Sequence, residues 1–447
     1  MKTVRGCSMA LAGALLATAC ARQAVLPDDA RFGADPVLPA PRHALLPTIE
    51  IAPARGWAGD ATPVTGAGFA VGKLACGLDH PRWLLVLPDG GVLVAETDAP
   101  VRPADGRGVR GWIMKQVMRR AGSGLPSADR ITLLRDADGD GRAETRSRYL
   151  EGLHSPFGMA LVGDTLYVAN ADALLRFAWE PGATSLRGPG QQVAPLPGGP
   201  INHHWTRSLL ASADGRHLYV GVGSNSNVAE NGLAVERQRA RILEIDPATG
   251  ATRPYASGLR NPVGMDFNPA DGTLWVVVNE RDELGNDLVP DYLTRVREGA
   301  FYGWPWSYWG AHEDARVQPP RPDQVARALV PDYSLGAHTA SLGLAFYDAD
   351  AFPARYRGGA FVGQHGSWNR DPPSGYKVVF VPFAGGRPSG PPEDVLTGFR
   401  SADGHANGRP VGVAVAADDA LLVADDVGGC VWRVTHATDD RSLEAGQ

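Results

Sequence analysis

The chain has 447 residues, with 43 Lys and Arg against 49 Asp and Glu and a formal net charge of −6. Because there is no basic excess, the composition argues against a protein that binds nucleic acid or an anionic membrane surface. The 55 Gly and 36 Pro favour many short strands joined by turns and disfavour a helix-rich fold. A closed β architecture can use this length as one unit.

The N-terminus has the pattern of an export signal. Lys2 and Arg5 precede an apolar run over residues 9–16, and small residues lead to Cys20. This stretch resembles a bacterial lipobox, whose Cys is lipid-modified. We therefore expect residues 1–19 to be a lipoprotein signal peptide and the mature protein to be periplasmic, anchored to the outer membrane through Cys20. No later apolar run reaches about 18 residues, so no transmembrane helix is expected in the mature protein.

Residues 20–64 are rich in Pro, Ala and Arg without periodicity, which predicts a linker, and residues 437–447 form a short C-terminal tail. Cys76 and Cys430 lie just before the first and within the last of the repeats described next. An oxidising periplasm would permit them to pair. Two separate buried thiols are equally consistent with the sequence.

Six versions of one hairpin pattern follow, each an apolar strand, a polar turn and a second β-rich strand. They are Leu84–Glu96, Gly158–Asn170, Ser208–Gly221, Gly264–Asn279, Gly343–Gln364 and Gly412–Asp425. Four follow the pairs His80-Pro81, Ser155-Pro156, Asn261-Pro262 and Arg409-Pro410, where Pro can begin an innermost strand. Such repeats, at intervals of roughly 50 to 80 residues, indicate radially arranged four-stranded sheets. The predicted fold is an all-β, six-bladed β-propeller over residues 65–436.

Two insertions interrupt this pattern. Within Ala99–Arg130, apolar Trp112, Ile113, Val117 and Met118 alternate with Lys115, Arg119 and Arg120, which predicts one amphipathic helix. We expect it to lie over the ring rather than on a membrane. Ala311–Pro331 is rich in Pro and Arg and predicts a surface loop.

An acidic stretch places carboxylates where one tight loop could surround a hard cation. Its members are Asp136, Asp138, Asp140 and Glu144. The stretch differs from an EF-hand at its twelfth position, Ser147, where a bidentate Glu would be needed. A structural calcium loop and a solvated acidic turn are both consistent with it.

His203 and His204 are candidates for a proton acceptor near Arg207. Because they are adjacent, an extended strand would direct only one of them into a given pocket. A packed or surface histidine is the alternative. No third ligand stands at a spacing typical of zinc.

Cations recur at or near the starts of the repeats. Arg260 precedes Asn261, Arg409 precedes the sixth repeat, and Arg370 and Lys377 follow the fifth. A planar Arg beside an Asn suits a planar ligand that bears carboxylates. If these cations converge, they form a pocket that receives an anion.

Four stretches together resemble a known family: GGPINHHWTR, YASGLRNPVGMDFNPADGTLWVVVNERDELGNDL, REGAFYGWPW and GQHGSWNRDPPSGYKVV. They resemble the sorbosone dehydrogenase-like branch of the soluble pyrroloquinoline quinone (PQQ)-dependent sugar dehydrogenases, over about residues 65–436. The resemblance implies a six-bladed propeller with PQQ on a calcium ion at one mouth of the ring. It also implies a small sugar substrate and an electron acceptor that the sequence does not identify.

The same resemblance assigns roles to individual residues. His203, four residues before Arg207, matches the general base, with His204 as the alternate. Arg260 acts with it and, together with Asn261, matches the pair that contacts the quinone. The backbone carbonyls of Glu280 and Arg281 match the calcium site. The other positions assigned to cofactor binding are His154, Arg207, Thr339, His365, Arg370, Lys377 and Arg409.

Some positions depart from the family pattern. Glucose-oxidising members have Gly-Pro where this chain has Glu280-Arg281, a glutamine contact maps near Leu153-His154, and Asn407 stands at one of two cofactor arginines. The predicted function is oxidation of an aldose or sugar aldehyde at C1, with hydride passing to PQQ and a proton to His203. The alternatives are a propeller that only binds a glycan or protein, and a calcium-dependent lactone hydrolase.

Overall fold

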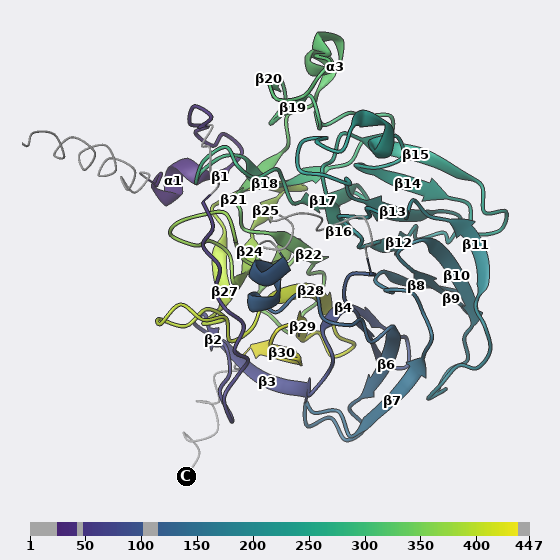
Figure 1. Ribbon diagram of the computed structural model, residues 1–447. Helices are drawn as coiled ribbons and strands as arrows, with labels where there is room; N and C mark the ends of the chain where they lie inside the picture. Colours follow the sequence, from purple (N-terminus) through teal and green to yellow (C-terminus); the bar gives the residue numbers. More distant parts are fainter. Residues whose placement is uncertain (1–24, 43–47, 102–114, 437–447) are drawn as a thin grey trace, which may run out of the picture.

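The computed structural model describes residues 25–42, 48–101 and 115–436 (Figure 1). The predicted signal peptide, Cys20 and the C-terminal tail lie outside these residues. Among the described helices, none combines the length and apolar character needed to cross a bilayer.

The described chain forms a β-propeller of six antiparallel blades, as predicted (Figure 1). Blade 1 contains β4 (Pro81–Val86), β5 (Val92–Glu96), β6 (Arg130–Arg135) and β7 (Thr145–Leu150). Blade 2 contains β8 (Met159–Val162), β9 (Thr165–Ala169), β10 (Ala173–Ala178) and β11 (Gln191–Pro195). Blade 3 contains β12 (Leu209–Ala211), β13 (Leu218–Val222), β14 (Arg241–Ile245) and β15 (Thr252–Ser257).

Blades 4 and 5 each carry an extra outer strand from the N-terminal region. Blade 4 contains β16 (Pro262–Phe267), β17 (Leu274–Val278), β18 (Pro290–Arg295), β21 (Tyr333–Ala337) and β1 (Phe32–Gly33). Blade 5 contains β22 (Ser341–Phe346), β23 (Ala360–Gln364), β24 (Lys377–Val381), β27 (Glu393–Thr397) and β2 (Val64–Thr65). Short elements between strands are the 3₁₀ turns Leu233–Glu236 and Ala354–Tyr356 and the small hairpin β25 (Phe383–Ala384) and β26 (Arg387–Pro388).

The predicted hairpins form because their strands can bury both faces between neighbouring blades. In β5, Leu93 packs toward blade 2 and Val94 toward blade 6, and both are fully buried. Tyr219 and Val220 divide in the same way between blades 4 and 2. The hydrophobic core is therefore a series of clusters between successive blades. This explains why the second strand of each blade has a continuous apolar sequence.

Blade 6 closes the ring by combining both ends of the propeller. It contains β28 (Pro410–Val415), β29 (Leu421–Asp425), β30 (Cys430–His436) and β3 (Phe69–Cys76). In the β3–β30 pair Cys76 lies opposite Cys430, and their sulfur atoms are bonded at 2.02 Å. Of the two possibilities left open by the sequence, the structure therefore has the disulfide.

The N-terminal segment differs from the expected linker because its described parts pack along the ring. The short helix α1 (Asp28–Arg31) leads into β1, which pairs with β21. The Ala52 carbonyl accepts a hydrogen bond from Arg409, and the indole of Trp57 donates to Asp425 at 2.7 Å. These contacts carry the segment over blades 5 and 6 before it enters β3.

The first insertion is helical over its described residues 115–120, in front of the centre of the ring in Figure 1. Its Arg120 carbonyl accepts a hydrogen bond from the Ala54 amide at 2.8 Å. Trp112 and Ile113 lie outside the described residues. The second insertion contains β20 (His312–Glu313), paired with β19 (Ser307–Tyr308), and helix α3 (Pro322–Arg327), and projects away from the ring.

Candidate functional site

Antiparallel pairing gathers many of the predicted site residues at one end of the ring. Pro81 at the start of β4 lies opposite Glu96 at the end of β5, and Pro410 lies opposite Asp425 in the same way. The residues just before each innermost strand and just after each second strand therefore share one end. We call this end the mouth.

His204 is placed at the mouth with a defined tautomer. Its Nδ1 lies 2.8 Å from the Ser224 carbonyl, which can only accept, so Nδ1 carries the proton and Nε2 keeps its lone pair. Burial lowers the pKa of His204 well below its ordinary value, and Arg260 and His203 lower it further. His204 is thus a neutral imidazole that can accept a proton through Nε2.

His203 is exposed, and its ring meets that of His204 edge-on at 5.2 Å between centroids. The two ring planes lie at 76° to each other, and both histidines remain candidates for the proton acceptor.

Arg207 is fully buried and binds protein carbonyls. It donates to the carbonyls of Pro197, His204 and Thr206 and to the Asn202 amide oxygen. A second guanidinium, Arg239, donates to the Pro197 and His204 carbonyls at 2.6 and 2.7 Å. Burial lowers the pKa of Arg239 to about 10. Together the two arginines fix the loop that carries the histidines, a role that the sequence did not predict for Arg239.

Arg260 and Asn261 lie directly beside His204. A Cβ on Gly223 would come within 2.2 Å of Asn261 Oδ1 and 2.5 Å of His204 Cβ, so only glycine allows this approach. The Asn261 Oδ1 atom is buried and has no hydrogen-bond partner in the described part of the chain. Burial of this kind usually signals a missing partner.

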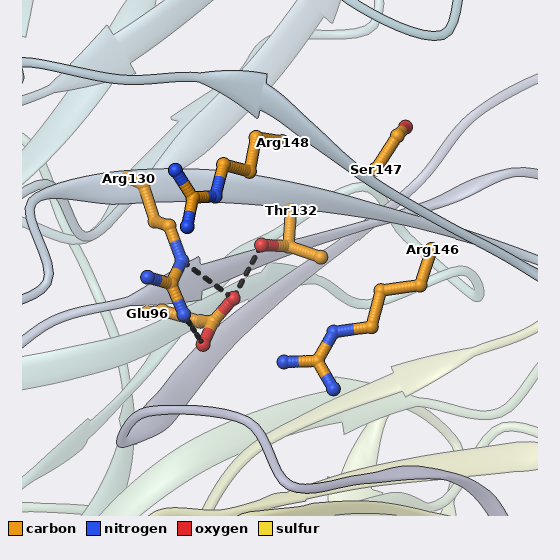
Figure 2. A pocket seen from close by; sticks show the side chains of 6 residues that line it. All are labelled: Glu96, Arg130, Thr132, Arg146, Ser147 and Arg148. Carbon is orange, nitrogen blue, oxygen red and sulfur yellow. Dashed lines mark hydrogen bonds and ion pairs between the residues drawn. The ribbon is translucent and has the colours of Figure 1, made fainter.

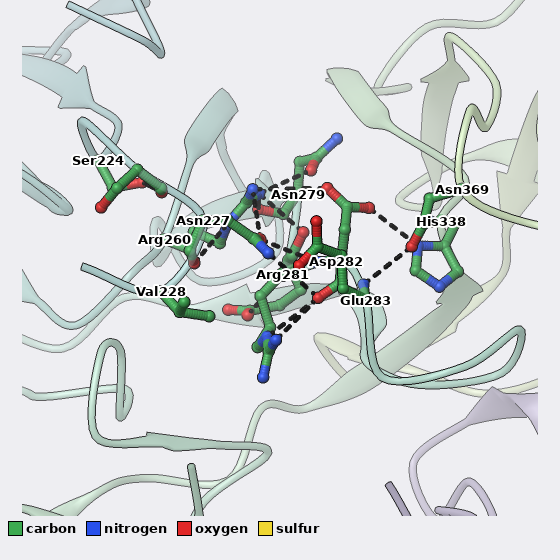
Figure 3. Close-up of polar contacts among 12 residues, drawn as sticks. Ser224, Asn227, Val228, Arg260, Asn279, Arg281, Asp282, Glu283, His338 and Asn369 are labelled. Atoms are coloured by element: carbon green, nitrogen blue, oxygen red, sulfur yellow. Dashed lines mark hydrogen bonds and ion pairs between the residues drawn. The ribbon is translucent and has the colours of Figure 1, made fainter. Parts of the chain in front are cut away.

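Arg260 organises the loop after β17 (Figure 3). Its Nη1 donates to the Glu280 carbonyl at 2.7 Å, and its Nη2 lies 3.6 Å from Asp282 Oδ2. Asp282 also pairs with His338 Nδ1 at 3.0 Å. Burial opposes both charges, but their mutual contact raises the pKa of His338 and lowers that of Asp282.

Two buried carboxyl groups nearby have raised pKa values. Burial raises the pKa of Glu280 to about 7 and that of Asp291 to about 6. Asp291 accepts hydrogen bonds from the Glu280 amide and from the hydroxyl of Thr339, both at 2.8 Å. Thr339 is therefore used to orient Asp291. Arg281 points into an ion pair with buried Asp314.

The Glu280 carbonyl, expected to bind calcium, instead accepts from the Arg260 guanidinium. A divalent cation there would lie beside a fixed positive charge, which Coulomb repulsion opposes. This arrangement does not fit calcium at the Glu280 carbonyl.

Arg409 lies at the mouth on blade 6 without a carboxylate partner among the described residues. Its guanidinium donates to the His365 carbonyl at 3.1 Å and the Ala52 carbonyl at 3.2 Å, and lies 4.7 Å from the Tyr376 ring centroid. Its Nε is buried with no partner in the described chain. A buried cation that meets only carbonyls and a ring fits an anionic group.

Three other predicted cofactor contacts have protein partners in the structure. Arg370 is buried against Asp287, with 2.9 Å between Nη2 and Oδ1. Lys377 begins the third strand of blade 5 and pairs with Asp394 at 2.6 Å. His154 is half-exposed and pairs with Asp172 at 2.9 Å. Asn407, at the position of a missing family arginine, accepts from Arg55 at 3.0 Å.

The acidic stretch forms the turn between β6 and β7. Ligand oxygens of Asp136, Asp138, Asp140 and Glu144 lie within 4.8 Å of one another. Backbone amides of Gly139 and Gly141 each donate to Asp136 at 2.8 Å. The predicted convergence of the four carboxylates is therefore present, and their donor set fits a hard cation.

Blade 1 also borders a cavity of about 260 Å³ that the sequence did not predict. Figure 2 shows Arg130 and Thr132 hydrogen-bonded to Glu96, with Arg146 and Arg148 alongside. Glu96 is fully buried, and its hydrogen bonds raise the pKa of Arg130. The Arg130–Glu96 pair joins β6 to the end of β5. No sequence motif marks it.

Comparison with known proteins identifies the family. A family model described as TrAA12-like matches residues 130–292 and 323–437. An uncharacterized protein of Borreliella burgdorferi is 30% identical over 249 residues, 55% of this chain and 64% of that protein. The pyrroloquinoline quinone-dependent pyranose dehydrogenase of Coprinopsis cinerea is 25% identical over 429 residues, 82% of this chain and 53% of that protein. Aldose sugar dehydrogenase YliI of Escherichia coli is 32% identical over 100 residues, 22% of this chain and 25% of that protein.

These matches span less than two thirds of the curated relatives' own lengths. Among solved structures, the Trichoderma reesei carbohydrate-active enzyme of family AA12 has a TM-score of 0.67 and 20% identity, covering 87% of this chain and 99% of that one. The PQQ domain of the Coprinopsis cinerea pyranose dehydrogenase has a TM-score of 0.66 and 22% identity, covering 87% and 100%. At this identity the two structures support the propeller fold. Because the family model covers more than half of the sequence, the chain belongs to the TrAA12-like family.

Proposed function

We propose that the protein is a PQQ-dependent dehydrogenase that oxidises an aldose or sugar aldehyde at C1 and passes the electrons to an external acceptor. The names of two relatives, a pyranose dehydrogenase and an aldose sugar dehydrogenase, support this class of substrate. The sequence resemblance described above supports the sorbosone-like branch within it.

Arg409 and Asn261 are the residues that would hold PQQ. Arg409 is a buried cation without a carboxylate partner in the described chain, and Asn261 Oδ1 is a buried acceptor without a donor there. Both lie at the mouth, on blades 6 and 4. When bound, PQQ supplies an acceptor for the hydride that leaves the sugar carbon.

His204 would accept the proton of the sugar hydroxyl. Its Nδ1–H is held by the Ser224 carbonyl, so Nε2 keeps the lone pair that would accept the proton. Burial, reinforced by Arg260, lowers the pKa of His204 and so keeps the imidazole neutral in the free protein. This neutral, oriented imidazole beside the Arg260–Asn261 pair is the observation on which the proposal depends.

The first test is sugar oxidation by the full chain reconstituted with PQQ and CaCl₂, followed as sugar-dependent reduction of ferricyanide. His204→Gln should lower kcat/KM by about 10²-fold or more, the scale of a lost general base. The matched variant His203→Gln should retain most of the activity. Full activity of His204→Gln together with loss in His203→Gln would move the role to His203.

PQQ binding provides a second readout that does not need turnover. Arg409→Gln should weaken binding of PQQ at least tenfold in a fluorescence titration, because a charge-assisted contact is lost. If PQQ binds neither the wild type nor the variant, the dehydrogenase proposal fails and the alternative of a propeller that only binds a partner or glycan is favoured.

We also propose that calcium binds the turn over residues 136–144, where it would have a structural role. The four converging carboxylates support this site. The calcium-dependent lactone hydrolase has no comparable support, because Arg260 and Arg409 lie at the mouth where its metal would be needed.

We further propose that the protein is exported to the periplasm and anchored to the outer membrane through Cys20. The basic residues Lys2 and Arg5, the apolar run and the small residues before Cys20 support this. Cys20→Ser should release the protein from the membrane fraction, and unchanged membrane association would contradict the anchor.

A further inference from the structure

A second histidine at the mouth is held by a carboxylate. His365 follows β23, and its Nε2 lies 2.9 Å from Asp426 Oδ2. Asp426 follows β29, is buried, and also accepts from Arg82 Nη1 at 2.7 Å. Three blades thus contribute to one polar cluster: Arg82 from blade 1, His365 from blade 5 and Asp426 from blade 6.

The protonation states of this cluster follow from its contacts. Burial opposes ionisation of Asp426, but His365 and Arg82 outweigh it and lower its pKa. Burial also lowers the pKa of His365, opposed by Asp426 and reinforced by Arg409. His365 is therefore neutral, donates through Nε2 to the carboxylate and keeps a lone pair on Nδ1. Nδ1 has no hydrogen-bond partner among residues 25–42, 48–101 and 115–436.

Contacts lead from His365 through Asp426 and Arg82 to Trp205, on the loop that carries His204. The Arg82 guanidinium that holds Asp426 also lies 5.7 Å from the ring centroid of Trp205. Trp205 is the residue after His204 and is itself buried. Arg409, which would hold PQQ, donates to the His365 carbonyl at 3.1 Å, so His365 also lies at the mouth, with its Nε2 fixed by Asp426.

The surrounding groups make His365 the better supported acceptor of positive charge. His204 faces Arg260 and Arg239 and is fixed by a neutral carbonyl. His365 faces Arg82, Arg409 and, through Asp426, His80, but its own ring contacts a carboxylate. A carboxylate stabilises the imidazolium that forms when a histidine takes a proton.

Oxidation of a carbinol to a carbonyl by a one-electron acceptor releases two electrons and two protons. One proton comes from the O–H bond; the other leaves carbon as part of the hydride and is released when the electrons pass on. If the site had a single proton acceptor, that group would have to lose the first proton to solvent before it could take the second.

We propose that His365, oriented by Asp426, is the second proton acceptor of the site and takes the proton released when electrons leave for the external acceptor. This inference rests on the proposed function. His204 accepts the hydroxyl proton, and the His365–Asp426 pair passes the second proton to solvent. Arg82 is a positioning residue for this pair.

The two half-reactions separate the roles. Ferricyanide takes electrons without protons, so both protons must pass to the protein or solvent. His365→Gln should slow steady-state ferricyanide reduction at least tenfold more than it slows single-turnover sugar oxidation by the PQQ-loaded protein. His204→Gln should have its larger effect on single turnover. Equal losses in both measurements for His365→Gln would overturn the proposal.

A measurement on the protein without PQQ tests the pair independently of turnover. In ¹⁵N NMR of histidine-labelled protein, His365 should show a protonated Nε2 and an unprotonated Nδ1 at pH 7. Asp426→Asn should change that tautomer or its titration. Arg82→Gln should weaken the interaction between His365 and Asp426, because Arg82 holds the Asp426 carboxylate. A protonated Nδ1 in the wild type would contradict the proposal even if sugar oxidation is found.

The matched control is His217→Gln. His217 also contacts a carboxylate, with Nδ1 3.5 Å from Glu244, but it lies on the β12–β13 turn at the opposite end of the blade. It should leave both half-reactions unchanged. If the wild type oxidises no sugar, the proposed function fails, while the NMR result still decides whether His365 is arranged as a proton acceptor.

Discussion

At the scale of single residues, the behaviour of His204 depends on a backbone carbonyl twenty positions away. The Ser224 carbonyl fixes the proton on Nδ1, and burial together with Arg260 disfavours a second proton. Sequence reasoning limited the choice to His203 or His204, because neighbours on a strand face opposite ways. The family resemblance assigned the role to His203 with His204 as the alternate, and the sequence could not show the contacts of His204, which depend on how blade 3 meets blade 4.

The buried, neutral state of His204 predicts a pH dependence of stability. Its folded-state pKa is lower than the ordinary value near 6.5, so the unfolded chain binds a proton that the folded chain does not as the pH falls below 6.5. The free energy of unfolding should therefore decrease from pH 7 to pH 5, and less so in His204→Gln. Urea unfolding of both proteins at the two pH values measures this. An equal decrease in both would remove His204 as a cause.

The predicted cations show why a charge pattern in the sequence overestimates the number of cations that are available to bind a ligand. Arg260 and Arg409 reach the mouth, but Arg370 pairs with Asp287 and Lys377 with Asp394. Each acidic partner comes from another strand or loop, and nothing local to the cation indicates that it is already neutralised. A cation's availability is decided by tertiary pairing.

At the scale of elements, the prediction for the acidic turn involved the shortest stretch of sequence. The structure brings the four carboxylates of this turn together. Residues 136–144 lie within one hairpin connection, so their geometry depends on few distant contacts. The N-terminal segment is the opposite case. The strands β1 and β2 have two residues each, and they form because blades 4 and 5 offer an edge. Composition without periodicity could only predict a linker there.

The acidic turn predicts a response to calcium. Added CaCl₂ should raise the free energy of unfolding, by about 2.7 kcal/mol when the free ion is at 100 times its Kd. Asp138→Asn should abolish the increase, because it removes one of four ligands. Asp214→Asn, in the β12–β13 turn of blade 3, is the control. Thermal unfolding with and without calcium measures the effect, and an increase in Asp138→Asn equal to that of the wild type would exclude the turn.

At the scale of the whole molecule, the six-bladed ring was predictable because the same hairpin recurs six times. Each copy buries residues such as Leu93 and Val94 on both faces, as a closed circle of sheets allows. How the ring closes was less certain, since β3 has no hairpin partner nearby in the sequence. The positions of Cys76 and Cys430 allowed the two ends to meet, but the sequence left their pairing open.

The disulfide should contribute substantially to stability. Cys76 and Cys430 are 354 positions apart, so the bond restricts nearly the whole unfolded propeller. Replacing both by Ala should lower the free energy of unfolding by about 2–4 kcal/mol, the usual range for a native bridge. Denaturant unfolding of oxidised wild type and the double variant gives the difference. A reducing agent should destabilise the wild type and leave the variant unaffected, and identical midpoints throughout would contradict this role.

The mixed origin of blade 6 has a consequence for unfinished chains. The ribosome produces β3 hundreds of residues before β30, so its hydrogen-bonding edge stays open during most of translation. A chain that ends before β28 would also leave the side of blade 1 that faces blade 6, including Leu84 and Val94, without most of its packing partners. Such fragments should pair with copies of themselves. The full-length protein avoids this association once β30 pairs with β3.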